Sequence, residues 1–77
     1  MPHIILKLYP GRSDRVKKQL AEEIVKNVAE IANCGEDTIS LAIEEIEPDD
    51  WVETVYKPDI LDKAHTLYKK PGYDPFV

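Results

Sequence analysis

Few residues of this 77-residue chain have the types and the spacing that catalysis or metal binding requires. Its two histidines, His3 and His65, stand far apart with no pair of ligands near either, so each is expected to be an ordinary strand or helix residue. Glycine-rich nucleotide loops, nucleophile elbows and CxxC pairs are absent. The unusual feature that remains is Pro2 directly before an apolar segment, with Arg12 in a turn at the other end of that segment.

Pro2 and Arg12 each have an ordinary structural interpretation beside a functional one. A proline is tolerated at a strand edge because its missing N–H faces away from the ladder, and an arginine beside a helix cap can be a solvated turn residue. The nitrogen of Pro2 is an amide without a basic lone pair while Met1 is attached. We favour the functional interpretation for both residues.

Two strands and a long helix are expected to position these residues. Residues 3–9 and 38–46 each alternate apolar and polar side chains with the period of two that a half-buried strand requires. Between them an apolar stripe recurs every three or four residues, which predicts a helix with one face packed on a sheet. Ser13 is the expected N-cap of this helix, and Asn33 with Gly35 is its expected end. The stripe consists of Val16, Leu20, Ile24, Val28 and Ile31.

The order strand, helix, strand predicts an α+β protomer with a β-α-β fold. A helix of about twenty residues between two short strands favours a parallel pair with a right-handed crossover. The uncovered face of the sheet would leave Ile5 and Ala42 exposed in a monomer. A short chain with one cysteine, Cys34, has neither a large core nor an internal disulfide. We therefore expect one domain over residues 1–77, with a partner subunit completing the sheet.

The last thirty residues are expected to add two further helical segments. An acidic turn at residues 47–50 leads into a short segment of one or two helical turns that holds Trp51. Pro58 is expected at the first position of a final helix, where its missing N–H costs nothing. The aromatic tail, residues 73–77, is expected either to extend freely or to lie on a neighbouring subunit.

Charge and hydropathy exclude several classes of protein. The formal net charge is −5, and the ten lysines and arginines are scattered, so no basic stripe predicts a nucleic-acid partner. No segment approaches the roughly 20 apolar residues that a membrane span needs. We expect a cytoplasmic protein, and its single Cys34 fits a compartment in which thiols stay reduced.

The order and spacing of these features resemble the 4-oxalocrotonate tautomerase family. Over about the first fifty residues the resemblance rests on Pro2, the turn Gly11-Arg12-Ser13-Asp14, the long amphipathic helix, the second strand and Trp51. Residues 47–51 and 69–73 are similar to the longer, dimeric PptA-type members rather than to the short hexameric ones. The resemblance implies an isomerase that interconverts keto and enol groups with no cofactor or metal. It favours a homodimer, with a hexamer as the alternative.

The resemblance also implies the roles of four residues. In the family the initiator methionine is removed and the exposed proline, here Pro2, acts as general base. The pKa of an α-amino group is about 8, so catalysis at neutral pH requires burial or a nearby cation to lower it. Arg12 is expected to bind a substrate carboxylate in bidentate fashion. Trp51 is expected to form an aromatic wall of the pocket, its alternative being a core or interface residue.

Ser40 marks a departure from the short hexameric members, which carry a second arginine at that position. A serine offers a substrate a hydroxyl group but no charge. The expected substrate is therefore the enol of a 2-oxo acid with a single carboxylate, such as an aryl pyruvate. Two alternatives stay open: hydration, dehalogenation or decarboxylation of unsaturated acids by a protonated Pro2, and a dimer without catalytic activity.

Overall fold

The computed structural model describes all residues from 1 to 77, and they divide into two compact units, Met1–Glu45 and Ile46–Val77. The first unit consists of β1 (His3–Leu8), α1 (Asp14–Ala32), η1 (Glu36–Thr38) and β2 (Ser40–Glu45). The second consists of η2 (Pro48–Asp50), η3 (Val52–Leu61) and η4 (Ala64–Thr66). The single domain expected from the sequence stays a prediction.

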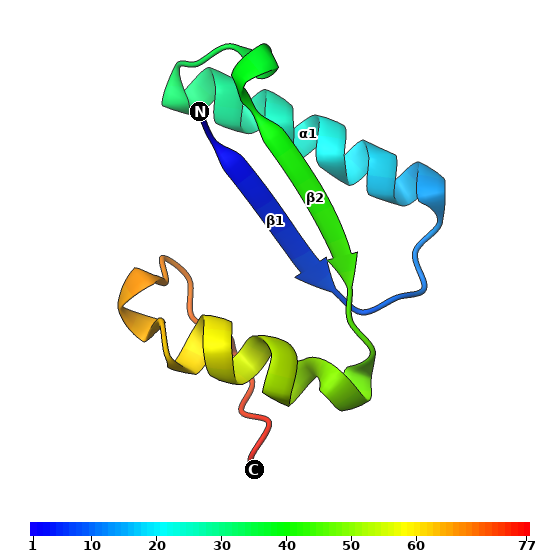
Figure 1. Ribbon diagram of the computed structural model, residues 1–77, viewed down its shortest axis with the longest axis vertical. Coiled ribbons are helices and arrows are strands. Elements are labelled where there is room, and N and C mark those ends of the chain that lie inside the picture. The colour runs from blue at the N-terminus through cyan, green and yellow to red at the C-terminus, as the bar shows by residue number, and fades with distance from the viewer. The chain divides into compact units, whose positions relative to one another are not determined.

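The first unit has the predicted β-α-β arrangement, which confirms the α+β fold class. The strands β1 and β2 pair in parallel, in a register that runs from His3 opposite Ser40 to Leu8 opposite Glu45. The helix α1 lies along one side of this pair (Figure 1). Leu41 lines a surface depression together with Ala21 of α1. Side chains alternate between the two faces of a strand, so every second side chain of β2, counted from Leu41, faces the helix.

The predicted caps define both ends of α1. The Ser13 side chain accepts a hydrogen bond of 3.2 Å from the backbone N–H of Val16, and Asn33 adopts the left-handed conformation with φ 57°. Ahead of the cap, Gly11 has φ 124°, which a residue with a side chain rarely adopts, so glycine sets the path from β1 to Arg12.

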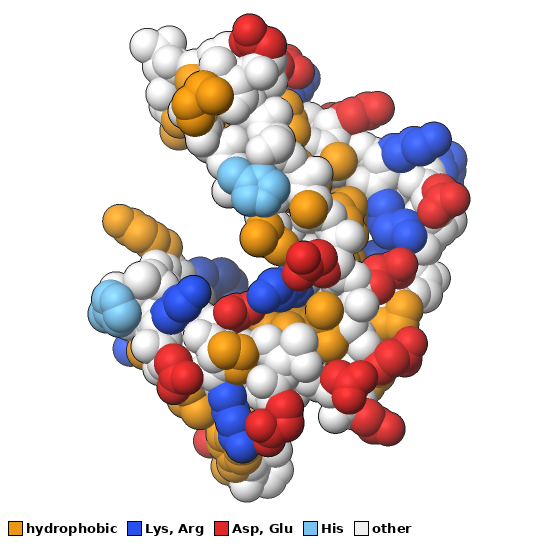
Figure 2. Space-filling model, viewed as in Figure 1, with side chains coloured by type: hydrophobic (Ala, Val, Ile, Leu, Met, Phe, Trp, Pro, Cys, Tyr) orange, Lys and Arg blue, Asp and Glu red, His pale blue; other side chains and the backbone are white.

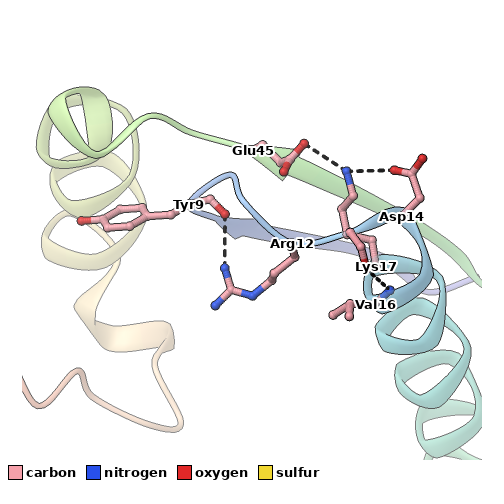
Figure 3. Close-up of polar contacts among 7 residues, drawn as sticks. Tyr9, Arg12, Asp14, Val16, Lys17 and Glu45 are labelled. Carbon is pink, nitrogen blue, oxygen red and sulfur yellow. Dashed lines mark hydrogen bonds and ion pairs between the residues drawn. The ribbon is translucent and has the colours of Figure 1, made fainter.

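An ion-pair cluster joins the first turn of α1 to the end of β2 (Figure 3). Lys17 Nζ lies 3.1 Å from Glu45 Oε1 and 3.4 Å from Asp14 Oδ1. The hydrogen bond to Glu45 is the main reason that the pKa of Lys17 is raised, and Asp14 adds to the effect. Because the pKa is raised, this contribution to stability is present at neutral pH and is lost only in strong alkali, as the lysine deprotonates.

Little of the chain is buried by its own contacts. Only Val55 and Tyr56 lie below a tenth exposure, while Ile5 on the uncovered face of the sheet is 49% exposed, as expected. Ile31 corrects the predicted stripe, because it is 84% exposed rather than packed on a sheet. A helix of 19 residues spans about 28 Å, whereas strands of six residues span about 20 Å, so the helix outruns the sheet. A subunit with so small a core supports the expectation of a partner.

The helical segment of the second unit corrects the predicted position of Pro58. This proline is inside η3 instead of at the start of a final helix. The segment winds as a π-helix, and the Asp62 N–H donates to the Lys57 carbonyl at 2.9 Å, five residues back. A proline has no N–H to donate and its ring displaces the carbonyl of the preceding turn, which the wider winding accommodates. Beyond Leu61 only the single turn η4 is helical.

The aromatic tail folds onto its own chain rather than extending freely. Tyr56 lies 5.7 Å from Tyr73 and 5.6 Å from Phe76 between ring centroids, the second pair edge to face. Whether the tail also covers a partner subunit stays a prediction. None of the helices combines the length and the apolar composition that a membrane crossing requires. The cytoplasmic location stays a prediction as well.

Candidate active site

Pro2 directly precedes the first residue of β1, His3. Its carbonyl accepts a hydrogen bond of 3.1 Å from the backbone N–H of Ser40, the first residue of β2, and its ring is half-buried. Met1, in contrast, is fully exposed. The sheet therefore fixes Pro2 through its carbonyl and leaves its nitrogen directed toward the chain end, where it would be a free amine without Met1.

The side chain of Ser40 contacts the side chain of His3 at this end of the sheet. Its Oγ lies 2.6 Å from His3 Nδ1, a short hydrogen bond between residues opposite each other in the two strands. The same serine therefore holds the Pro2 carbonyl through its backbone and the His3 ring through its hydroxyl. The structure brings Pro2, His3 and Ser40 together.

Arg12 lies at the opposite end of β1. Its Nη1 donates a hydrogen bond of 3.3 Å to the Tyr9 carbonyl, and the side chain is exposed on the loop before α1 (Figure 3). The six residues of β1 separate this end from Pro2 by about 20 Å. Within one protomer, Arg12 and Pro2 therefore cannot both contact the same small substrate.

Trp51 belongs to the second unit, at the junction of η2 and η3. Its indole Nε1 donates a hydrogen bond of 2.9 Å to the hydroxyl of Tyr73. Tyr73 in turn packs on the buried Tyr56. The tail thus holds the indole of Trp51 from one edge, a contact between residues 22 positions apart in the sequence.

Replacing Tyr73 by phenylalanine is expected to move the fluorescence emission of Trp51 to longer wavelength. The ring packing on Tyr56 is kept, but the indole N–H loses its hydroxyl acceptor and turns to water, at a cost of about 1 kcal/mol in unfolding free energy. Trp51 is the sole tryptophan, so the emission reports on it directly. Tyr68→Phe is the matched control, because Tyr68 is fully exposed and its hydroxyl contacts no indole. Identical spectra for both variants would contradict the contact.

His3 has a contact, to Ser40, that the sequence interpretation did not predict. It was taken as an ordinary strand residue because no metal ligands accompany it, and no cluster of three or more His, Cys, Asp or Glu side chains forms around it. The signal that could have found it is its place immediately after Pro2, at the start of a strand whose partner begins at Ser40. Both histidine side chains of the chain are exposed, and Figure 2 shows both at the surface.

Known proteins resemble this chain in sequence and in fold. Residues 2–55 match the sequence model of the Tautomerase family, described as a tautomerase enzyme. The chain is 40% identical over 74 residues to Tautomerase PptA of Pectobacterium carotovorum, covering 95% of this chain and 97% of that protein. It is 37% identical over 73 residues to a Xylella fastidiosa protein named "Probable tautomerase", covering 95% and 89%. The crystal structure of YwhB, a homologue of 4-oxalocrotonate tautomerase, superposes with a TM-score of 0.61 at 33% identity, covering 62% of this chain and 79% of that one.

Proposed function

The chain belongs to the tautomerase family and is an isomerase, and from this premise we propose that Pro2 catalyses keto–enol tautomerisation once Met1 has been removed. The observation that carries the proposal is the position of Pro2, where the family match begins and where the Pro2 carbonyl accepts the Ser40 N–H at the start of the sheet. The proposed substrate is the enol of a 2-oxo acid. Family membership supports a small-molecule substrate and an oligomeric assembly.

In the proposed ketonisation, the amine of Pro2 acts first as the base and then, once protonated, as the acid. In the ketonisation of such an enol, the proton of the C2 hydroxyl passes to the neutral Pro2 nitrogen as the O–H bond breaks. The ammonium then gives a proton to C3, the C2 oxygen becomes a carbonyl, and the amine is regenerated. Atoms and electrons balance without any oxidant or reductant. The amine must be neutral at the working pH, which partial burial of Pro2 and a nearby cation both favour.

We propose that this cation is Arg12 of the partner subunit. A two-fold axis perpendicular to the sheet makes the strands of two protomers antiparallel, so the start of one β1 comes to the end of another. This arrangement overcomes the roughly 20 Å that separates Pro2 from the Arg12 of its own chain. The planar guanidinium would bind the substrate carboxylate with two hydrogen bonds. A homodimer with two such sites is the simplest assembly of this kind.

The proposed substrate has a single carboxylate. At the first residue of β2 the chain presents Ser40, which provides no charge for a second carboxylate. Trp51 is proposed as the aromatic wall of the pocket, where an aryl ring would stack on its indole. An aryl enol pyruvate meets both conditions.

The test compares two substrates with protein whose mass shows that Met1 is gone. Ketonisation of phenylenolpyruvate and of a 2-oxo dicarboxylic acid enol, each followed by ultraviolet absorbance, should give the higher kcat/KM for the monoacid. A preference for the diacid would contradict the substrate assignment. Rates equal to buffer for both substrates would remove the proposed activity.

A further inference from the structure

The starts of β1 and β2 hold a hydrogen-bonded group that the mechanism above does not use. The hydroxyl of Ser40 lies 2.6 Å from His3 Nδ1, while the backbone N–H of Ser40 donates to the Pro2 carbonyl at 3.1 Å. One residue therefore fixes both the strand that carries the proposed base and the imidazole beside it. Pro2 and His3 are consecutive residues, and their Cα atoms lie about 3.8 Å apart.

His3 projects from the open face of the sheet. Side chains alternate between the two faces of a strand, and Leu41 and Glu45 of β2 face α1. Ser40 and its opposite residue His3 therefore lie on the face away from α1. The imidazole is exposed there, and the next residue on that face, Ile5, is 49% exposed. A ligand at this end of the sheet can reach the ring.

The contact with Ser40 leaves one ring nitrogen of His3 for another partner. A neutral imidazole has one N–H donor and one acceptor, and the partner of one nitrogen selects the role of the other. When the Ser40 hydroxyl donates to Nδ1, the ring proton is on Nε2, and Nε2–H becomes a donor at the mouth of the site. A neutral donor of this kind can stabilise a developing enolate oxygen without supplying a proton.

We propose that His3 is a second substrate-binding group of the site, whose Nε2–H donates a hydrogen bond to the C2 oxygen of a 2-oxo acid. Ser40 is the positioning residue that holds the ring in this tautomer. This inference rests on the proposed function and extends it, because it adds a hydrogen-bond donor at the reacting oxygen, where Pro2 accepts the proton and a carboxylate-binding arginine makes no contact. It also gives Ser40 a role through His3 instead of a direct one on the substrate.

Nuclear magnetic resonance of the imidazole nitrogens tests the positioning directly. The spectra are recorded at pH 8, and a His65→Gln variant assigns the signals, since the chain has two histidines. We expect protonated Nε2 and unprotonated Nδ1 for His3, and a shift of Nε2–H when phenylpyruvate is added. Ser40→Ala should move both nitrogens toward the averaged values of an imidazole that exchanges between tautomers, and Ser40→Thr should restore the wild-type pattern. A proton on Nδ1 of the wild type overturns the proposal.

Kinetics test the contact with the substrate. His3→Phe should lower kcat for phenylenolpyruvate about tenfold or more with little change in KM, since the lost donor acts on charge that develops during the reaction. His3→Gln, whose side-chain amide can place an N–H near the Nε2 position, should recover part of the loss. His65→Phe is the matched control and should leave kcat unchanged.

The outcomes separate the two proposals. If the wild type ketonises the enol but His3→Phe keeps its kcat, or phenylpyruvate leaves the His3 signals in place, the His3 inference fails and the tautomerase proposal stands. If the wild type shows no ketonisation, the tautomerase proposal fails. The His3 inference then depends on the phenylpyruvate shift, and an absent shift overturns it too.

Discussion

Pro2→Ala is expected to lower kcat/KM for phenylenolpyruvate about 10²- to 10⁴-fold, the usual contribution of a positioned general base. The variant still exposes a primary amine once Met1 is removed, so a residual rate above buffer is expected. The backbone hydrogen bond from Ser40 to the carbonyl of residue 2 does not depend on the side chain, and the fold should persist. Stopped-flow or conventional ultraviolet kinetics give the rate, and urea unfolding checks the fold.

The direction in which kcat/KM changes with pH can also be predicted. The base acts in its neutral form, so wild-type kcat/KM should rise with pH and level off above the pKa of the Pro2 amine. The inflection should move in Pro2→Ala, because a different amine titrates. Pro10→Ala, two residues beyond the end of β1, is the control and should keep both the rate and the inflection. A Pro2→Ala variant with wild-type kcat/KM and an unmoved inflection would contradict the role of Pro2.

Arg12→Ala is expected to lower kcat/KM about 10²- to 10³-fold, chiefly through KM, as loss of a charge that pairs with a desolvated carboxylate usually does. Its intramolecular hydrogen bond to the Tyr9 carbonyl is exposed and weak, at 3.3 Å, so stability should change little. Arg15→Ala is the matched control, because Arg15 is the other arginine of the chain and is exposed on α1. Equal effects of the two substitutions would contradict a specific role for Arg12.

Mixing the two impaired variants tests the site shared between subunits. In a heterodimer of Pro2→Ala and Arg12→Ala chains, one site has both substitutions and the other has neither. Random pairing makes half of the dimers mixed, so the refolded mixture should regain about a quarter of the wild-type activity. If Pro2 and Arg12 of the same chain formed the site, no dimer would have an intact site. A mixture as inactive as its components would therefore contradict the two-subunit site.

The fold of the first unit could be predicted because its signals are local. Strand alternation, the N-cap at Ser13 and the left-handed Asn33 each depend on the few residues around them, and the structure has all three. Ile31 was misplaced because the stripe is longer than the six-residue strands on which it packs. Pro58 was misplaced because its preference for a first helical turn is statistical, while a wider winding can also accept it.

The candidate site could be predicted in part. The pattern pointed to Pro2 and Arg12, but a linear sequence does not show that six strand residues hold them about 20 Å apart. The contact between His3 and Ser40 joins residues 37 positions apart and depends on the register of two strands, which alternation alone does not fix. Tyr73 was assigned to a free or partner-bound tail because its contact with Trp51 is likewise a matter of tertiary packing.

The measurement that tests the central claim most directly compares two forms of the same sequence, one with Met1 removed and one with Met1 retained, each verified by intact mass. Retained Met1 converts the Pro2 nitrogen from a secondary amine into an amide with no basic lone pair, and it changes no other side chain. The account predicts ketonisation of phenylenolpyruvate by the processed form and a rate no higher than buffer for the form that retains Met1. Equal activity of the two forms would contradict catalysis by the Pro2 amine.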